Sequence, residues 1–279
     1  MPHRTPSRTS DIEQRLLIDA IYLRYHYDFR SYAQASLKRR LNAALVQFDC
    51  KTISQLQDRV LHEPEVFAEM LQYLTVQVSD MFRDPAYFRA LREQVLPVLR
   101  TYPSLKVWVA GCSAGEEVYS LAILLREAGL LERTLIYATD INPEALKSAS
   151  AGVFDAARVP DFTRNHAASG ASTSLSDYYS AGYGRVVFHK SLRDHMVFSD
   201  HSLATDSVFS EVHLVSCRNV LIYFERQLQD RALGLFRDSL VHRGFLGLGS
   251  KESLRFSNCS EDFEDFVTPQ RIYRKKALA

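Results

Sequence analysis

The stretch LKVWVAGCSAGEEVYSLAILLR, residues 105–126, decides the fold of this chain. Residues 107–110 form a short apolar run typical of a buried strand, and Gly111 and Gly115 bracket a turn of small residues. Apolar side chains then recur at helical spacing, at Val118, Leu121, Ala122 and Leu125. A strand, a glycine turn and a helix open a nucleotide-binding α/β domain, because glycine lets the backbone approach a ligand and free N–H groups at the helix start can face it.

The composition is that of an ordinary globular protein with a sizeable core. The 279 residues are 46% hydrophobic and 24% charged, which suggests one large domain, or one domain plus a smaller one. The 34 basic and 33 acidic residues do not indicate a nucleic-acid partner. No apolar run approaches the roughly 20 residues of a membrane span. We therefore expect a monomer that neither binds nucleic acid nor inserts into a membrane.

The cysteines and histidines do not predict a metal site. The four cysteines include no C-x-x-C pair, and the nine histidines show no ligand spacing. Residues 1–10 have no apolar core, so we expect a disordered tip and not a secretory signal. Reduced thiols and a cytoplasmic location follow as the default.

The next part of the chain predicts a small all-helical domain over residues 11–76. Ser10 and Glu13 have the spacing of a capping box at the start of the first helix. Further helices are expected at about 33–45, 53–61 and 65–76. Glycine is absent before Gly111, which suits helices joined by short links.

One face of the second helix carries a basic cluster, Lys38, Arg39 and Arg40. The cluster could dock an acidic partner helix or could simply be a solvated helix face. Composition alone favours the solvated face.

Residues 77–104 predict a linking helix before the α/β domain. Asp84-Pro85 provides a helix start, because proline is tolerated at the first helical position. Arg83 stands beside aromatic residues just before that start, and without other evidence it reads as a surface arginine.

The α/β domain is expected over 105–279. A second strand, 135–139, ends at Asp140, where nucleotide-binding folds place the partner of the ribose hydroxyls. Asp140 could instead cap the helix expected at 143–150, but after a glycine turn we favour the ribose role. Asp140 lies further than about 20 residues from Gly111 and G-x-G-x-x-G is absent, which argues against a nicotinamide enzyme.

The remaining strands complete a doubly wound, mostly parallel sheet of five or six strands. We expect them at 211–216, 245–249 and 271–275, with a helix at about 225–240. Asn219 follows the first of these at its carboxyl end, where open sheets bind ligands. Residues 152–197 break the rhythm and predict an inserted β subdomain. It would hold a flexible loop at 167–174 and short strands at 185–188 and 195–198, outside the main sheet.

Four motifs in order resemble one family. SDMFRDPAYF, GCSAGEEVYSLA, ATDINPEAL and VSCRNVLIYF, within residues 10–275, are similar to the chemotaxis-receptor methyltransferases, the CheR family. The resemblance implies a helical N-terminal domain and an S-adenosylmethionine-dependent α/β domain with a small β insert. It also implies methyl transfer to glutamates on the cytoplasmic helices of chemoreceptors, with S-adenosylhomocysteine as the other product.

The resemblance also implies roles for individual residues. Arg83 and Tyr223 would face the substrate glutamate, and Lys38, Arg39 and Arg40 would face the receptor's acidic helices. The cofactor would be held by residues from several motifs: Ser79, Arg83, Gly111, Glu116, Glu117, Asp140, Ser202, Leu203, Asn219 and Val220. Which of Glu116 and Glu117 contacts the methionine end stays open.

The sequence departs from the family pattern at four positions. Ser79 stands where threonine is usual and Met81 where an aromatic is usual. Ser202 stands where Asn or Asp is common, and His213 where Asp is common. Ser202 and His213 leave room for an alternative function, a non-catalytic adaptor that binds S-adenosylmethionine in a chemosensory complex. Intact Arg83 and Tyr223 argue for the enzyme.

Overall fold

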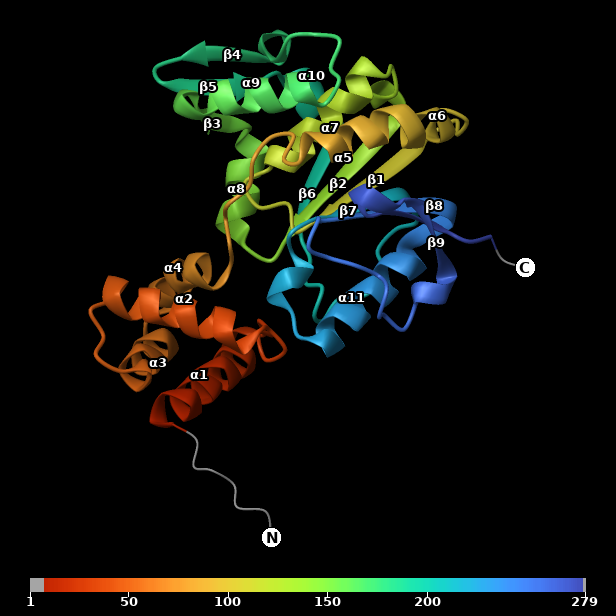
Figure 1. Cartoon of the computed structure of the whole chain (residues 1–279). Helices are drawn as coiled ribbons and strands as arrows, with labels where there is room; N and C mark the ends of the chain where they lie inside the picture. Colours follow the sequence, from red (N-terminus) through yellow and green to blue (C-terminus); the bar gives the residue numbers. More distant parts are fainter. Residues whose placement is uncertain (1–7, 278–279) are drawn as a thin grey trace. The chain divides into compact units, whose positions relative to one another are not determined.

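The computed structural model describes residues 8–277 and divides into two units. One unit holds the chain up to Val76 together with Tyr223–Gln229. The other holds Gln77–Ile222 and the chain from Asp230 onward (Figure 1).

Four helices form the first unit: α1 (Thr9–Tyr25), α2 (Gln34–Gln47), α3 (Ile53–His62) and α4 (Pro64–Leu74). Helix α1 packs on α3, and α2 packs on α4. Their buried side chains recur at helical spacing, for example Leu17 and Ile21 in α1. The ring of Tyr25 stacks on that of Phe67 with centroids 3.9 Å apart, which joins α1 to α4.

The start of α1 differs from the prediction. The helix begins at Thr9, its N-cap residue is Arg8, and no side chain caps it, so the predicted Ser10–Glu13 capping box is wrong. Glu13 instead accepts a hydrogen bond from the hydroxyl of Ser54 at 2.6 Å. Of the tip expected to be disordered, residues 1–7 lie outside the described residues, and 9–10 are helical.

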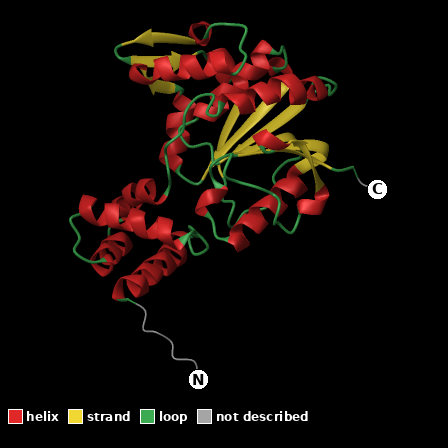
Figure 2. Ribbon diagram, viewed as in Figure 1, coloured by secondary structure: helices red, strands yellow, loops and turns green. Residues whose placement is uncertain are grey.

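A sheet forms the centre of the second unit (Figure 2). It has seven strands, in the order β6-β2-β1-β7-β8-β10-β9. The strands are β1 (Leu105–Ala110), β2 (Thr134–Asp140), β6 (Met196–Asp200), β7 (Val212–Cys217), β8 (Leu240–Leu248), β9 (Phe263–Val267) and β10 (Ile272–Lys275). The first five are parallel, and β10 is antiparallel to both of its neighbours. The carboxyl ends of the parallel strands therefore meet at one edge.

Helices cover both faces of this sheet. They include α5 (Pro85–Ala90), α6 (Leu96–Leu99), α7 (Glu116–Glu127), α8 (Pro143–Ala151) and α11 (Arg226–Ser239), with a π-helical segment η1 (Leu91–Val95) between α5 and α6. Val107 and Val109 of β1 belong to one apolar core with α5 and α7. Between them, Trp108 points to the other face and contacts Phe236 of α11, as strand alternation requires.

The predicted fold class, a doubly wound and mostly parallel sheet with a helical domain and a small β insert, is confirmed. Two details were wrong. β6 (Met196–Asp200) belongs to the main sheet, where it pairs with β2 in parallel, and not to the insert. The edge strand β9 was not predicted, because two of the five residues in FEDFV are charged and they interrupt any apolar run.

The insert contains an antiparallel sheet, β3-β5-β4, formed by β3 (Val153–Asp155), β4 (Tyr179–Gly182) and β5 (Arg185–Phe188). It also contains a helix that was not predicted, α9 (Val159–Ala168). Its shorter helical segments are η3 (Ala156–Arg158), η4 (Leu175–Tyr178) and α10 (Lys190–Arg193).

Short helical segments also occur outside the insert: η2 (Leu131–Arg133), η5 (Leu221–Tyr223), η6 (Ser260–Asp262) and η7 (Thr268–Gln270).

A buried carboxylate, Glu127 at the end of α7, joins the insert to the main domain. It accepts hydrogen bonds from His166 Nε2 at 2.9 Å, from the Thr173 hydroxyl, and from Arg92 Nη2 at 2.5 Å. Burial alone would raise the pKa of Glu127, but these three donors together lower it to about 2.

Candidate cofactor and substrate site

The glycine turn after β1 is shaped by contacts within the chain itself. Gly111 and Gly115 have backbone φ values of +72° and +97°, which residues other than glycine rarely adopt. A Cβ on Gly111 would lie 2.5 Å from Val220 Cγ2, and one on Gly115 would lie 3.0 Å from Ala149 Cβ. The glycines thus let Val220 and α8 close on the turn, whereas we had expected them to make room for a ligand alone.

Asp140, at the carboxyl end of β2, holds this turn in place. Its Oδ2 accepts from the backbone N–H of Ser113 at 2.9 Å, and its Oδ1 accepts from that of Asn142 at 3.0 Å. Burial raises the pKa of the Asp140 carboxyl, and the backbone donors oppose that rise. Asn142, and not Asp140, caps α8. Each carboxylate oxygen has a second lone pair, so the ribose role stays a prediction.

Glu117 is bound within a buried polar network. Its Oε1 accepts from the Ser216 hydroxyl at 2.6 Å and its Oε2 from Arg218 Nη1 at 2.9 Å. The Ser216 hydroxyl also lies 3.0 Å from that of Tyr87, and the Arg218 guanidinium stacks 4.1 Å from the centre of the Tyr87 ring. With both of its oxygens bonded, Glu117 has a role inside the protein.

Glu116 differs from its neighbour because half of its carboxylate has no partner. Its Oε1 accepts from Arg158 Nη1 at 2.7 Å, while Oε2 is buried and accepts no hydrogen bond from any described residue. Burial raises the pKa of this carboxyl, and Arg158 opposes the rise. Arg158, at the end of η3 in the insert, also binds Asp80 at 3.0 Å and the carbonyl of Ser79. A buried acceptor without a donor fits a cationic or N–H group of a ligand.

Arg83 lies between two residues in the left-handed region, Phe82 with φ +50° and Asp84 with φ +58°. Its carbonyl accepts from Arg218 Nη2 at 2.9 Å, and Arg218 also binds Asp84 Oδ2 at 2.8 Å. Its own side chain is half-buried and makes no hydrogen bond or ion pair with any residue in the described range 8–277. The backbone at Arg83 is therefore fixed while the guanidinium is left for another partner.

Asn219 and Val220 follow β7 at the ligand-binding edge of the sheet. Asn219 has φ +62°, and its N–H donates to Glu252 Oε2 at 2.9 Å. Glu252 also accepts from the N–H groups of Gly249 and Ile222. Burial raises the pKa of Glu252, although hydrogen bonds from these backbone N–H groups partly oppose the rise. Glu252 was not predicted, because a lone glutamate in a polar loop carries no local signal.

Two further predicted cofactor residues, Ser202 and Leu203, lie in one turn, and His213, Cys112 and Cys217 are bonded or packed within the protein. The N–H of Ser202 donates to Asp206 at 2.9 Å and its hydroxyl accepts from Ala204 N–H, so it shapes its own turn, in which Leu203 is buried. His213 Nδ1 accepts from the N–H of Lys106. Burial raises the thiol pKa of Cys112 and Cys217 well above its usual range, which suits packing residues.

The basic cluster of α2 is divided by the structure. Lys38 Nζ pairs with Asp11 at 2.6 Å and Arg39 is exposed. Arg40 is only 7% exposed, donates to the carbonyl of Leu74, and lies 4.5 Å from the centre of the Tyr223 ring. The prediction of a docking surface that includes Arg40 is wrong, because its side chain packs inside the helical unit.

Residues 8–277 contain neither a metal-binding cluster nor a membrane-spanning helix. No group of three or more His, Cys, Asp or Glu side chains there could hold a metal ion. No helix in that range is both long and apolar enough to cross a membrane.

The fold and site are those of an S-adenosylmethionine-dependent methyltransferase. The chain belongs to the CheR methyltransferase family. The family's SAM-binding domain matches residues 77–271 and its all-alpha domain matches 12–75, so the resemblance seen in the motifs is confirmed.

Several relatives agree with this assignment. Cher3 of Pseudomonas putida is 62% identical over 271 residues, which cover 97% of this chain and 99% of the relative. Chemotaxis protein methyltransferase 1 of Pseudomonas aeruginosa is 31% identical over 88% of this chain and 91% of its own. The chemotaxis protein methyltransferase of Listeria monocytogenes is 31% identical over 81% and 84%.

The residues present fit the cofactor, S-adenosylmethionine. The unpartnered Glu116 Oε2 suits the ammonium group of its methionine half. Of the two candidate glutamates, the structure favours Glu116, since both oxygens of Glu117 are already bonded. Arg158, which sequence reasoning missed, is the residue that holds Glu116 in place.

Proposed function

We propose that this enzyme transfers the methyl group of S-adenosylmethionine to glutamate side chains on the cytoplasmic helices of chemoreceptors, forming γ-methyl esters. It would act in the cytoplasm during chemotactic adaptation. The observation that carries the proposal is the unpaired guanidinium of Arg83, held on a fixed backbone. A planar guanidinium binds both oxygens of a carboxylate, and a glutamate side chain offers such a group.

The chemistry asks little of the protein. When bound, S-adenosylmethionine supplies a methyl group that its sulfonium has already activated. A glutamate carboxylate is already a nucleophile at neutral pH because its ordinary pKa is about 4.3. The chain therefore needs no general base, and buried Cys112 and Cys217 have no step to perform.

Positioning would supply most of the rate. In well-oriented systems the barrier falls by roughly 7–11 kcal/mol, because translational and rotational entropy is already lost on binding and solvent reorganisation is avoided. Arg83 would hold the carboxylate in line with the methyl group and remove it from water. Glu116 would hold the methionine end, with Arg158 as its positioning residue, and Asp140 would hold the ribose.

The helical unit would bind the receptor. Lys38 and Arg39 remain the basic residues of α2 that a partner can reach, and acidic receptor helices would complement them. Tyr223 is assigned to the substrate by the family resemblance, with its hydroxyl orienting the carboxylate.

Labelled methyl transfer tests this function. The full chain is incubated with methyl-labelled S-adenosylmethionine and membranes that carry chemoreceptors. We expect label in the receptor band, released as methanol by mild base, because an ester hydrolyses there and a methylated amine does not. Receptors with glutamine at the modified glutamates serve as the control. Base-stable label, or equal label in that control, would contradict glutamate esterification.

A further inference from the structure

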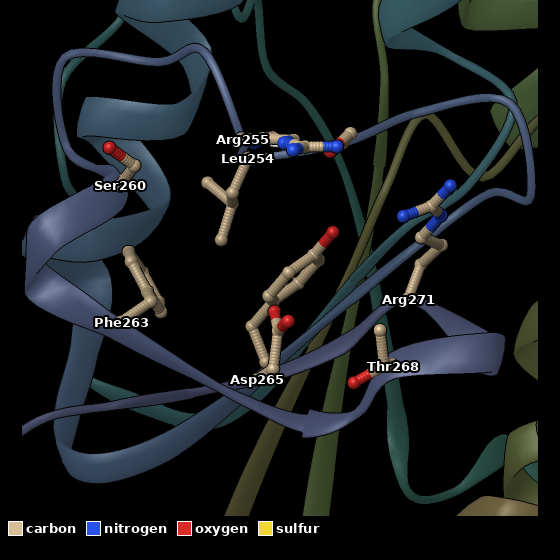
Figure 3. Close-up of a pocket in the computed structure, with 9 residues that line it drawn as sticks. Leu254, Arg255, Ser260, Phe263, Asp265, Thr268 and Arg271 are labelled. Carbon is tan, nitrogen blue, oxygen red and sulfur yellow. Dashed lines mark hydrogen bonds between the residues drawn. The ribbon is translucent and has the colours of Figure 1, made fainter.

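A hollow of about 370 Å³ lies between the loop after β8 and the β9–β10 hairpin (Figure 3). None of its lining residues has a place in the cofactor site. Arg255 and Ser253 come from the loop, Thr268 and Arg271 from η7 and the residue after it, and Asp265 and Tyr273 from the paired strands. Its polar side chains thus come from three separate segments.

The two arginines of this hollow have no anionic partner. Neither guanidinium makes an ion pair or donates a hydrogen bond to any residue of 8–277, and the Asp265 carboxylate is equally unpaired. The backbone at Arg271 is fixed, with φ +54°, because its carbonyl accepts from Leu248 N–H at 3.0 Å and its N–H donates to Thr268. Two arginines and one aspartate give the lining a net positive charge, which favours an anion.

The other lining groups narrow the class of anion. Hydroxyl-bearing Ser253, Thr268 and Tyr273 line the same hollow, and guanidinium and hydroxyl donors together suit the three oxygens of a phosphate. The volume lies in the range of small-molecule sites, about 300–1,000 Å³, and exceeds what a bare phosphate needs. Asp265 can only accept hydrogen bonds when ionised, so the rest of the ligand should offer a hydroxyl.

We propose that this hollow binds a small phosphorylated molecule that also bears a hydroxyl group. The phosphate would lie on Arg255 and Arg271, and the hydroxyl would donate to Asp265.

The same loop connects the hollow to the cofactor site. Glu252, which accepts from the N–H of Asn219, directly precedes Ser253 in the chain. A ligand that orders Ser253 and Arg255 would also favour the loop position in which Glu252 holds Asn219. By linkage, it would tighten cofactor binding, and the cofactor would tighten its binding by the same factor.

Calorimetric titration of the full chain tests the binding. The probes are glycerol 3-phosphate and inorganic phosphate. We expect glycerol 3-phosphate to bind more tightly, and the double variant R255Q/R271Q to lose at least about tenfold in affinity for both. The double variant R185Q/K147Q removes two exposed positive charges elsewhere and should keep wild-type affinity. Absence of binding, or an equal loss in R185Q/K147Q, would overturn the site.

Two further measurements separate the parts of the proposal. D265A, which removes the acceptor, should abolish the advantage of glycerol 3-phosphate over inorganic phosphate; an unchanged advantage would overturn the hydroxyl assignment. Without phosphate, R255Q/R271Q should bind S-adenosylhomocysteine as the wild type does, which shows an intact fold. When glycerol 3-phosphate is present, the affinity for S-adenosylhomocysteine should rise in the wild type but not in R255Q/R271Q. An unchanged affinity in the wild type would overturn the coupling.

Discussion

The guanidinium of Arg218 and the carboxylate of Glu117 form a buried ion pair at 2.9 Å, and the same guanidinium reaches the carbonyl of Arg83 at 2.9 Å. Arg218 follows β7, Glu117 lies in the first turn of α7, and Arg83 precedes α5. One buried guanidinium therefore links helix α7 to the backbone of the proposed carboxylate clamp.

Replacing Arg218 by methionine should lower the free energy of unfolding by about 3–5 kcal/mol, because Glu117 would be left as an unpaired buried charge. Denaturant titration measures the loss. Arg185→Met, at an exposed position of β5, should change stability by no more than about 0.5 kcal/mol. A similar small loss in R218M would show that the pair contributes little.

Arg83→Ala should lower methyl transfer by about a hundredfold or more and change the affinity for S-adenosylhomocysteine far less, since we assign the guanidinium to the substrate carboxylate and not to the cofactor role that the resemblance also implies. Labelling assays and calorimetry give the two numbers. Arg89→Ala removes an exposed arginine of the next helix and should transfer methyl normally. The clamp role is wrong if R83A binds the cofactor poorly and turns over bound substrate at the normal rate.

Asp140→Ala should weaken S-adenosylhomocysteine binding, and it should also cost about 1–3 kcal/mol of stability, because the N–H groups of Ser113 and Asn142 lose their acceptor. Asp155→Ala, in the insert, is the matched control for loss of an exposed backbone-binding aspartate. An unchanged dissociation constant in D140A would refute the ribose assignment and leave Asp140 a purely structural role.

Arg158→Gln should weaken cofactor binding more strongly at low pH. Burial already raises the pKa of Glu116 and Arg158 opposes that rise, so the variant protonates Glu116 at a higher pH. A protonated Glu116 cannot pair with an ammonium group. Calorimetry between about pH 8 and about pH 6 should show a steeper loss in R158Q than in the wild type or in R158K. Parallel pH profiles would mean that Arg158 acts only on the fold.

The Glu127 cluster should make stability depend on acid. The folded-state pKa of Glu127, about 2, lies below its ordinary value, so its contribution is complete above that ordinary value and is lost as the pH falls toward 2. The shift corresponds to roughly 3 kcal/mol. Glu127→Gln should lose this acid-sensitive part in denaturant titrations at about pH 7 and about pH 3, whereas Glu132→Gln, at an exposed position, should not.

The sequence predicted the parts of the fold that depend on local pattern. The strand–turn–helix at residues 105–126 and the helices of the first unit follow from apolar periodicity, and β1, β2 and α7 lie within a residue or two of their predicted ranges. β6 was wrongly assigned to the insert, since the partner of a short strand depends on distant residues. The Ser10–Glu13 capping box was wrong because α1 already begins at Thr9, which places Ser10 inside the helix and leaves Glu13 to bind Ser54.

Within the site, the sequence indicated which residue types gather there but not how they share their bonds. It left Glu116 and Glu117 equivalent, and only the positions of Ser216, Arg218 and Arg158 distinguish them. It also placed Arg40 on the surface, since three successive basic residues do not reveal which one turns inward.

The segment Tyr223–Gln229 belongs to the helical unit although it lies deep in the C-terminal half of the chain. Its Phe224 pairs with Tyr32 as an isolated bridge, and Tyr223 provides the ring beneath Arg40. Expression of residues 1–76 alone would therefore yield a helical unit that lacks the segment Tyr223–Gln229, which packs as part of it. A fragment that carries 223–229 on a linker should be the smallest one that folds like the intact unit.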